Sequence, residues 1–203
     1  MVRMVLVVVQ RGGLNLPAYG TNGFTLVELL VVMSIIAVGL ALSAEPLRDL
    51  RDRNRLSGEV ARFQESLRLA RTEAVMRNIA VSLCPSHMAS SGAPVCNGDY
   101  GEGWIVFSNA DRDRNVDAED DEVLRIFEGL PPGFRVTRGG SDTAAANLIN
   151  YLPDGTSRNN QTLRFCPPPG SRADAIRIVI NSVGRHRLET AQDSCTRRMG
   201  SGG

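Results

Sequence analysis

A short basic segment near the end of the chain, Gly184-Arg185-His186-Arg187, has the residue types and spacing of an anion-binding site. Side chains alternate along a strand, so Arg185 and Arg187 are expected on one face, and His186 on the other face or in a turn. Two neighbouring guanidinium groups can each hold a phosphate through a bidentate contact that does not depend on base sequence. The segment therefore indicates a site for a phosphate-rich polymer. The alternative is a pair of solvent-exposed arginines at the end of a hairpin.

The charge distribution favours a basic surface around this segment. Residues 161–203 hold seven arginines against three acidic residues, a net charge of +4, whereas the whole chain carries +1. The acidic residues Asp174, Glu189 and Asp193 weaken the positive charge of this region. The arginines that could extend the site are Arg164, Arg172, Arg177, Arg197 and Arg198. Clustered arginines are an electrostatic footprint of nucleic-acid binding.

An acidic segment at 111–122 resembles the loop of an EF-hand calcium site. The residues at the EF-hand ligand positions 1, 3, 5, 7 and 12 are Asp111, Asp113, Asn115, Asp117 and Glu122. Position 6, where the EF-hand loop needs glycine for a sharp turn, is Val116. Strands, not helices, are expected on both sides of the segment. It is therefore either a weak calcium site or the polar tip of a hairpin, and no other cofactor is expected.

An apolar stretch of 21 residues runs from Phe24 to Ala44 and contains a single charge, Glu28. At 1.5 Å per residue, a helix of this length crosses a hydrocarbon core of ~30 Å. Arg3 and Arg11 precede the stretch, so the leader is expected in the cytoplasm and the rest of the chain is expected to be exported. A charge inside such a span is costly, which indicates a specific role for Glu28. The alternative is a plain single-pass anchor with a glutamate near the interface.

Gly23-Phe24-Thr25-Leu26-Val27-Glu28, followed by an apolar helix, resembles the class III signal of type IV pilins and of type II secretion pseudopilins. The resemblance implies that a prepilin peptidase cuts between Gly23 and Phe24 and methylates the new N-terminus. It also implies that Glu28 pairs with the N-terminal amine of a neighbouring subunit, which offsets the cost of burying both charges. The expected partners are therefore prepilin peptidase, other pilins and, before assembly, the inner membrane.

The four cysteines contain no C-x-x-C pair, and only two histidines accompany them, which argues against a zinc site. An even number of cysteines in an exported domain fits two disulfides. Three pairings are possible for four cysteines. We favour Cys84–Cys96 and Cys166–Cys195, because each of these bonds would fasten a loop or the tail.

After the apolar stretch, the spacing of hydrophobic residues is first typical of a helix and then typical of strands. A helical stripe with spacings of three and four residues predicts one helix from about Phe24 to Arg77 whose second half packs on a sheet. The stripe consists of Leu56, Val60, Phe63, Leu67, Ala70 and Ala74. Beyond Asn78 the pattern favours strands at 79–84, 103–108, 123–127, 134–138, 147–152 and 162–166. The segment 175–189 is expected to form two strands that turn at 182–184.

Several of these segments resemble the FimT/GspH family of minor pilins and pseudopilins. They are Arg68-x-x-Arg71-x-Glu73-Ala74, Ser82-x-Cys84-Pro85 and Trp104-x-Val106-Phe107. Gly184-Arg185-His186-Arg187 is similar to the G-R-x-R motif of FimT-type minor pilins. The resemblance extends from Gly23 to Leu188. It implies an α+β protein with the type IV pilin fold, in which a long N-terminal helix packs on one or two antiparallel β-sheets.

The resemblance also implies a function. In FimT-type minor pilins the G-R-x-R motif is associated with binding of double-stranded DNA during natural transformation. The chain is therefore expected to be a minor pilin that contributes to pilus assembly and binds DNA at Arg185, Arg187 and the neighbouring basic residues. The alternative is a GspH-type pseudopilin of a type II secretion system with a purely structural role. No nucleophile elbow, P-loop or dinucleotide motif is present, so an enzyme is not expected.

These expectations divide the chain into five segments. They are a prepilin leader (1–23), a transmembrane and filament-core helix (24–45), the soluble half of the same helix (46–78), a β-rich pilin domain (79–189) and a C-terminal tail (190–203). The protein is expected first as a single-pass protein of the inner membrane with a periplasmic C-terminal domain. It is then expected in an extracellular pilus.

Overall fold

The computed structural model describes residues 23–117, 119–141, 143–158, 160–191 and 195, and leaves the side chains of 41–46 outside that description. The chain divides into two compact units, Met1–Ser43 and Ala44–Gly203. The long predicted helix is present as α1 (Leu26–Arg77). Among the described residues, no helix has a stretch that is both long and apolar enough to cross a membrane.

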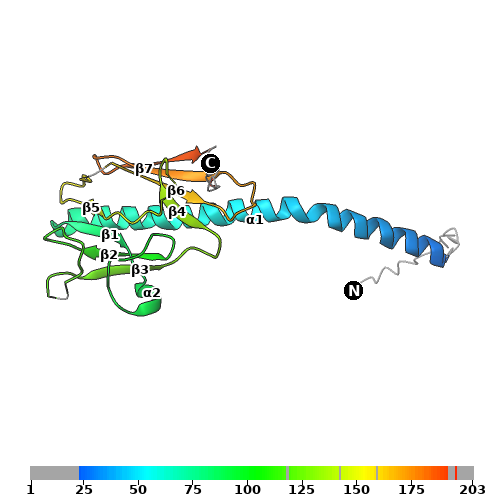
Figure 1. Ribbon diagram of the computed structural model, residues 1–203, viewed down its shortest axis with the longest axis horizontal. Helices are drawn as coiled ribbons and strands as arrows, with labels where there is room; N and C mark the ends of the chain where they lie inside the picture. The colour runs from blue at the N-terminus through cyan, green and yellow to red at the C-terminus, as the bar shows by residue number, and fades with distance from the viewer. Residues whose placement is uncertain (1–22, 118, 142, 159, 192–194, 196–203) are drawn as a thin grey trace, which may run out of the picture. The chain divides into compact units, whose positions relative to one another are not determined.

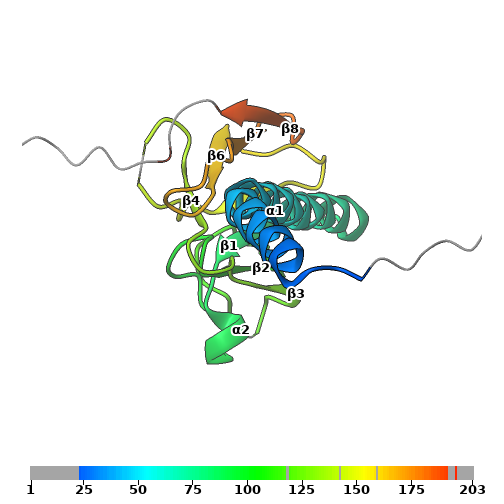
Figure 2. The same cartoon turned by 90° about the vertical axis from the view of Figure 1, so that its right-hand side faces the viewer.

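In the described part of the second unit, eight strands form two antiparallel sheets. Sheet A has the order β3-β2-β1-β5, with β1 (Val81–Pro85), β2 (Gly103–Ser108), β3 (Val123–Glu128) and β5 (Ile149–Tyr151). Sheet B has the order β4-β6-β7-β8, with β4 (Arg135–Arg138), β6 (Gln161–Cys166), β7 (Ala175–Ile180) and β8 (His186–Ala191). The part of α1 in this unit lies between the two sheets (Figures 1 and 2). The predicted α+β architecture, a long N-terminal helix packed on antiparallel sheets, is confirmed, with two sheets.

The hydrophobic stripe of α1 forms the centre of the core. All six of its predicted residues, Leu56, Val60, Phe63, Leu67, Ala70 and Ala74, are buried. Phe63 is the residue that joins the layers, because its ring contacts side chains from both sheets. Its centroid lies 5.2 Å from that of Trp104 in β2 and 5.3 Å from that of Phe165 in β6. Tyr100, in the loop before β2, packs edge-on against the same ring at 5.3 Å.

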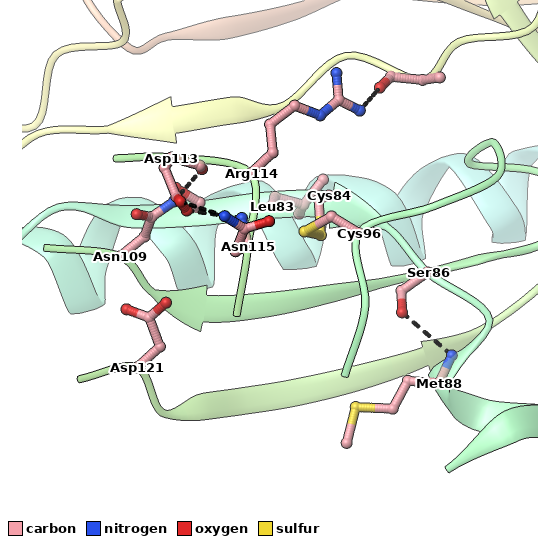
Figure 3. Close-up of a disulfide and its surroundings, with 12 residues drawn as sticks. Leu83, Cys84, Ser86, Met88, Cys96, Asn109, Asp113, Arg114, Asn115 and Asp121 are labelled. Atoms are coloured by element: carbon pink, nitrogen blue, oxygen red, sulfur yellow. Dashed lines mark hydrogen bonds between the residues drawn. A yellow bond between two sulfur atoms is a disulfide. The ribbon is translucent and has the colours of Figure 1, made fainter. Parts of the chain in front are cut away.

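A smaller core covers the other face of sheet A. Cys84, Ile105 and Phe107 are buried there, and the short helix α2 (Met88–Ser91) contributes Met88. The disulfide Cys84–Cys96 ties the segment after α2 to β1 (Figure 3). A second disulfide, Cys166–Cys195, ties the segment after β8 to the end of β6. Both predicted pairings are therefore confirmed.

The observed elements differ from the predicted ones mainly at their ends. Each strand predicted between residues 79 and 166 is present with ends that differ by at most two residues, and 175–189 forms the expected two strands. β8, however, continues to Ala191, because Thr190 and Ala191 still pair with Ile176 and Ala175 of β7. The tail therefore begins later than the predicted Thr190. The helix α2 was not predicted, since four residues carry no readable period.

Replacing the residue between the sheets tests this account of the core. Phe63→Ala should lower the free energy of unfolding by about 3–5 kcal/mol, because it leaves a cavity shared by both sheets. Urea unfolding of the full chain in detergent measures the change. Met76→Ala, at an exposed position of the same helix, is the control and should change stability by less than about 0.5 kcal/mol. Equal losses in both variants would contradict the assignment.

Candidate functional site

The basic segment predicted to bind an anion lies at the turn between β7 and β8. Arg187 is the second residue of β8, pairs with Val179 and is exposed. Arg185 lies in the turn, immediately before the strand, and is also exposed. The backbone N–H of Arg185 donates to the side-chain oxygen of Asn181 at 2.9 Å, and the backbone N–H of Asn181 donates to the carbonyl of Arg185 at 3.0 Å. The structure therefore presents two exposed guanidinium groups at one end of sheet B.

The turn that carries Arg185 is held by close packing against a second turn. Gly184 has φ +75, and a Cβ atom there would lie 2.1 Å from the carbonyl oxygen of Gly155. Only glycine fits, since it has neither the side chain that would clash nor a penalty at positive φ. Arg71 of α1 fastens both turns, because its guanidinium donates to the carbonyls of Gly155 at 2.9 Å and Val183 at 3.4 Å. The motif glycine thus serves packing, and the helix fixes the position of the hairpin.

His186 lies on the opposite face of β8 from Arg187. It pairs with Ile180, whose side chain is fully buried, so it faces the helix side of the sheet. Burial lowers the pKa of His186, and the charges of Arg68 and Arg71 lower it further. Its ring is therefore neutral at neutral pH and adds no charge to the basic surface. The expected alternation of the motif side chains is confirmed for His186 and Arg187.

The outer face of sheet B carries a row of arginines next to the hairpin. Arg177 lies opposite Glu189 in the register, which places it on the same face as Arg187. Arg187 donates from Nε to Glu189 at 2.8 Å. Arg164 is opposite Arg177 but is almost fully buried, and it donates to the Thr137 hydroxyl at 3.2 Å and the Ser141 carbonyl at 3.1 Å. It therefore supports the sheet and does not reach the surface, contrary to the sequence-based suggestion.

The remaining arginines that were predicted to extend the basic surface are not placed next to the hairpin by the structure. Arg172 precedes β7 at the end of the sheet away from the turn, and six residues of strand separate these ends by about 20 Å. Arg172 is therefore not part of the hairpin surface. Arg197 and Arg198 lie outside the described residues, so the structure does not place them.

The N-terminal residues with an expected processing role begin the described chain. Gly23 and Phe24 are exposed and precede α1. Thr25 caps the helix, because its hydroxyl oxygen accepts the backbone N–H of Glu28 at 3.2 Å. Thr25 and Glu28 have the spacing of a capping box, a feature that the sequence analysis did not use. A carboxylate in the first turn also interacts favourably with the helix dipole.

The acidic segment brings together only some of the predicted calcium ligands. Carboxylate oxygens of Asp111, Asp113 and Asp117 lie within 4.8 Å of one another. Asn115 instead donates to both carboxylate oxygens of Asp113, through its backbone and side chain (Figure 3). Glu122 pairs with Arg77 at the end of α1. The structure therefore groups three of the five predicted ligands, while Glu122 lies outside this group, and calcium binding stays a prediction.

Asp121 lies beside this cluster and was not among the predicted ligands. Burial raises the pKa of its carboxyl group, the N–H of Asp117 lowers it, and the charges of the three neighbouring aspartates raise it again. The hydrogen bond from the Asp117 N–H measures 3.1 Å. Its place in the acidic run gave no signal, since the EF-hand template skips that position.

Comparison with known proteins decides the family. The family described as type II transport protein GspH matches residues 59–184, more than half of the chain. The chain belongs to the GspH family. The prokaryotic N-terminal methylation motif matches residues 20–44 of this GspH-family chain. No curated protein sequence matches it.

Solved structures share the fold of this GspH-family chain. The type IV minor pilin FimU of Pseudomonas aeruginosa strain PAO1 is 21% identical, with a TM-score of 0.50 over 72% of this chain and 99% of that one. The minor pseudopilin EpsH from the type 2 secretion system of Vibrio cholerae is 12% identical, with a TM-score of 0.47 over 68% and 99%. The likeness to FimU shows a shared fold, so this GspH-family chain combines that fold with an N-terminal methylation motif.

A substitution at the motif glycine tests its packing role. Gly184→Ala should destabilise the GspH-family chain by more than the roughly 1–3 kcal/mol that positive φ alone costs, because the added Cβ also meets Gly155. Chemical unfolding measures the loss. Gly140→Ala is a matched control, with φ +84 and no atom within 4 Å of the added Cβ. The packing role fails if the two variants lose the same stability.

Calcium addition tests the acidic cluster. With a Kd near ~1 mM, as in extracellular modules, about 5 mM calcium should raise the Tm by about 2–4 °C, and EDTA should reverse the shift. Asp113→Asn should remove the shift, whereas Glu119→Gln, at an exposed residue outside the cluster, should retain it. No shift in the unmodified chain leaves the acidic segment as a polar hairpin tip.

Proposed function

We propose that this GspH-family chain is a minor pilin of a type IV pilus that binds double-stranded DNA at the turn and first residues of β8. The observation that carries the proposal is the pair of exposed guanidinium groups of Arg185 and Arg187 on a fixed hairpin. Such groups bind phosphates without reading bases, so the DNA can have any sequence. This matches uptake of DNA from the surroundings in natural transformation.

The neighbouring charges are compatible with phosphate binding. Arg187 contacts Glu189, but both side chains are well exposed, at 66% and 38%. An exposed ion pair contributes only about 0.2–1 kcal/mol, so a phosphate can displace the carboxylate at little cost. Arg177 lies on the same face as Arg187 and adds positive charge to the proposed surface.

The N-terminal unit supplies the proposed route into the filament. A prepilin peptidase would cut between Gly23 and Phe24, and the apolar side chains between Phe24 and Leu40 are exposed in the isolated chain. Exposed apolar surface of this extent needs a partner, which would be the inner membrane before assembly and other pilins afterwards. Glu28 would then pair with the new N-terminal amine of a neighbouring subunit.

The second candidate is a pseudopilin of a type II secretion system with a structural role only. The description of the matched family, a type II transport protein, favours it. The fold does not separate the two candidates, so the surface chemistry of the β7–β8 hairpin has to decide. In either role the chain is proposed to act by assembly and binding, without catalysis.

A mobility-shift assay with the full chain in detergent tests DNA binding. The chain should shift two unrelated duplexes equally at about 50 mM salt, and the affinity should fall steeply as salt rises. Arg185→Ala with Arg187→Ala should lower the affinity roughly 10- to 100-fold and reduce the slope of log K against log salt by about two.

The matched control replaces two other exposed arginines, Arg53→Ala in α1 with Arg125→Ala in β3 of sheet A, which removes the same charge without touching sheet B. It should retain most of the affinity. No shift of either duplex at low salt rejects the DNA proposal and favours the pseudopilin. Equal losses in both double variants would mean that binding follows net charge and that the hairpin is not the site.

A further inference from the structure

A basic groove lies at the start of the second unit, far from the hairpin. It has a volume of about 800 Å³ and runs between α1 and the loop before β7. Its charged lining residues are Arg48, Arg51, Arg55, Arg172, Asp49 and Asp52. The backbone N–H of Arg172 donates to the carboxylate of Asp49 at 3.1 Å, which holds the loop against the helix. The groove is therefore a fixed surface with an excess of two positive charges.

The arginines of the groove repel one another. Arg48, Arg51 and Arg55 follow at spacings of three and four residues, so they share one face of α1. Like charges at this spacing destabilise a helix. Within the described part of the chain, none of these three guanidinium groups, nor that of Arg172, forms an ion pair or a hydrogen bond. Asp52, four residues after Arg48 and three before Arg55, offsets part of this repulsion, and the remaining excess of positive charge favours an anionic partner.

The chain itself carries an anionic segment of matching charge at the other end of α1. Residues 111–122 hold seven acidic residues and two arginines, a net charge of −5. Glu119 and Asp120 are exposed and form no ion pair within the described residues. The pair between Glu122 and Arg77, the last residue of α1, places this acidic loop at the C-terminal end of the helix. From Arg55 to Arg77, 22 residues of helix span about 33 Å.

We propose that the basic groove binds the acidic loop (111–122) of a second copy of this chain. The contact joins two different surfaces at opposite ends of the unit, so it is a head-to-tail contact, the type that builds an open filament when the rotation between subunits does not close a ring. Charge complementarity of this kind fixes the register and orientation of the partners. The inference does not depend on DNA binding, because the β7–β8 hairpin takes no part in it.

Charge reversal with the full chain in detergent tests the contact. Arg51→Glu in the groove and Asp120→Arg in the loop should each weaken self-association at least tenfold at about 50 mM salt, as measured by sedimentation. Mixing these two variants should restore association, because the reversed groove of one faces the reversed loop of the other. Arg53→Glu and Asp174→Arg reverse exposed charges outside both surfaces and should associate normally.

Thermal unfolding of each variant shows whether the fold is retained. The proposal is overturned if Arg51→Glu associates like Arg53→Glu, or if the mixture of the two interface variants does not recover. The same variants are also mixed with vesicles that contain phosphatidylglycerol. Loss of vesicle binding in Arg51→Glu with unchanged self-association would assign the groove to a lipid phosphate and would likewise overturn the proposal.

Discussion

The packing of Phe63 between the two sheets is the contact on which the globular unit depends. Neither sheet has a continuous core of its own on its inner face, and both place aromatic side chains against this one ring. Trp104 in turn stacks on Phe127 of β3, with ring centroids 5.3 Å apart, so the contact extends to the edge of sheet A. Because α1 supplies Phe63, the helix sets the distance and orientation of the sheets as well as the position of the surfaces that they carry.

The polar side chains of α1 extend this organising role to the surface. Arg71 fastens the turn of the β7–β8 hairpin, and Arg77 holds the acidic loop through Glu122. Asp49 holds the loop that contributes Arg172 to the basic groove. One face of the helix therefore builds the core, while its remaining faces position three separate charged surfaces. Each of these surfaces includes a loop or turn, which alone would have little fixed structure.

The sequence predicted what depends on local pattern. The hydrophobic stripe of α1, the strands and the turn at 182–184 follow from hydrophobic periods of 3.6 and 2 residues. The disulfide pairing follows from the choice of bonds that each close a loop or hold the tail. Contacts between distant segments were not predictable. Gly184 was expected to serve the binding motif, yet its neighbour is Gly155, 29 positions away. Arg164 and Arg172 look alike in sequence, but the register buries the first and strand length moves the second to the far end of the sheet.

The positions of the two disulfides bear on how the protein carries force. Cys84–Cys96 closes within the region of sheet A, and Cys166–Cys195 within that of sheet B. All four cysteines are used, so no disulfide crosses between the sheets, and the layers are joined covalently only by the chain connections on either side of β4 and β5. A load applied between α1 and sheet B is therefore resisted by packing and by hydrogen bonds such as those of Arg71 and Asp49. Under tension the packing around Phe63 would yield first, while each disulfide keeps its own region of sheet closed.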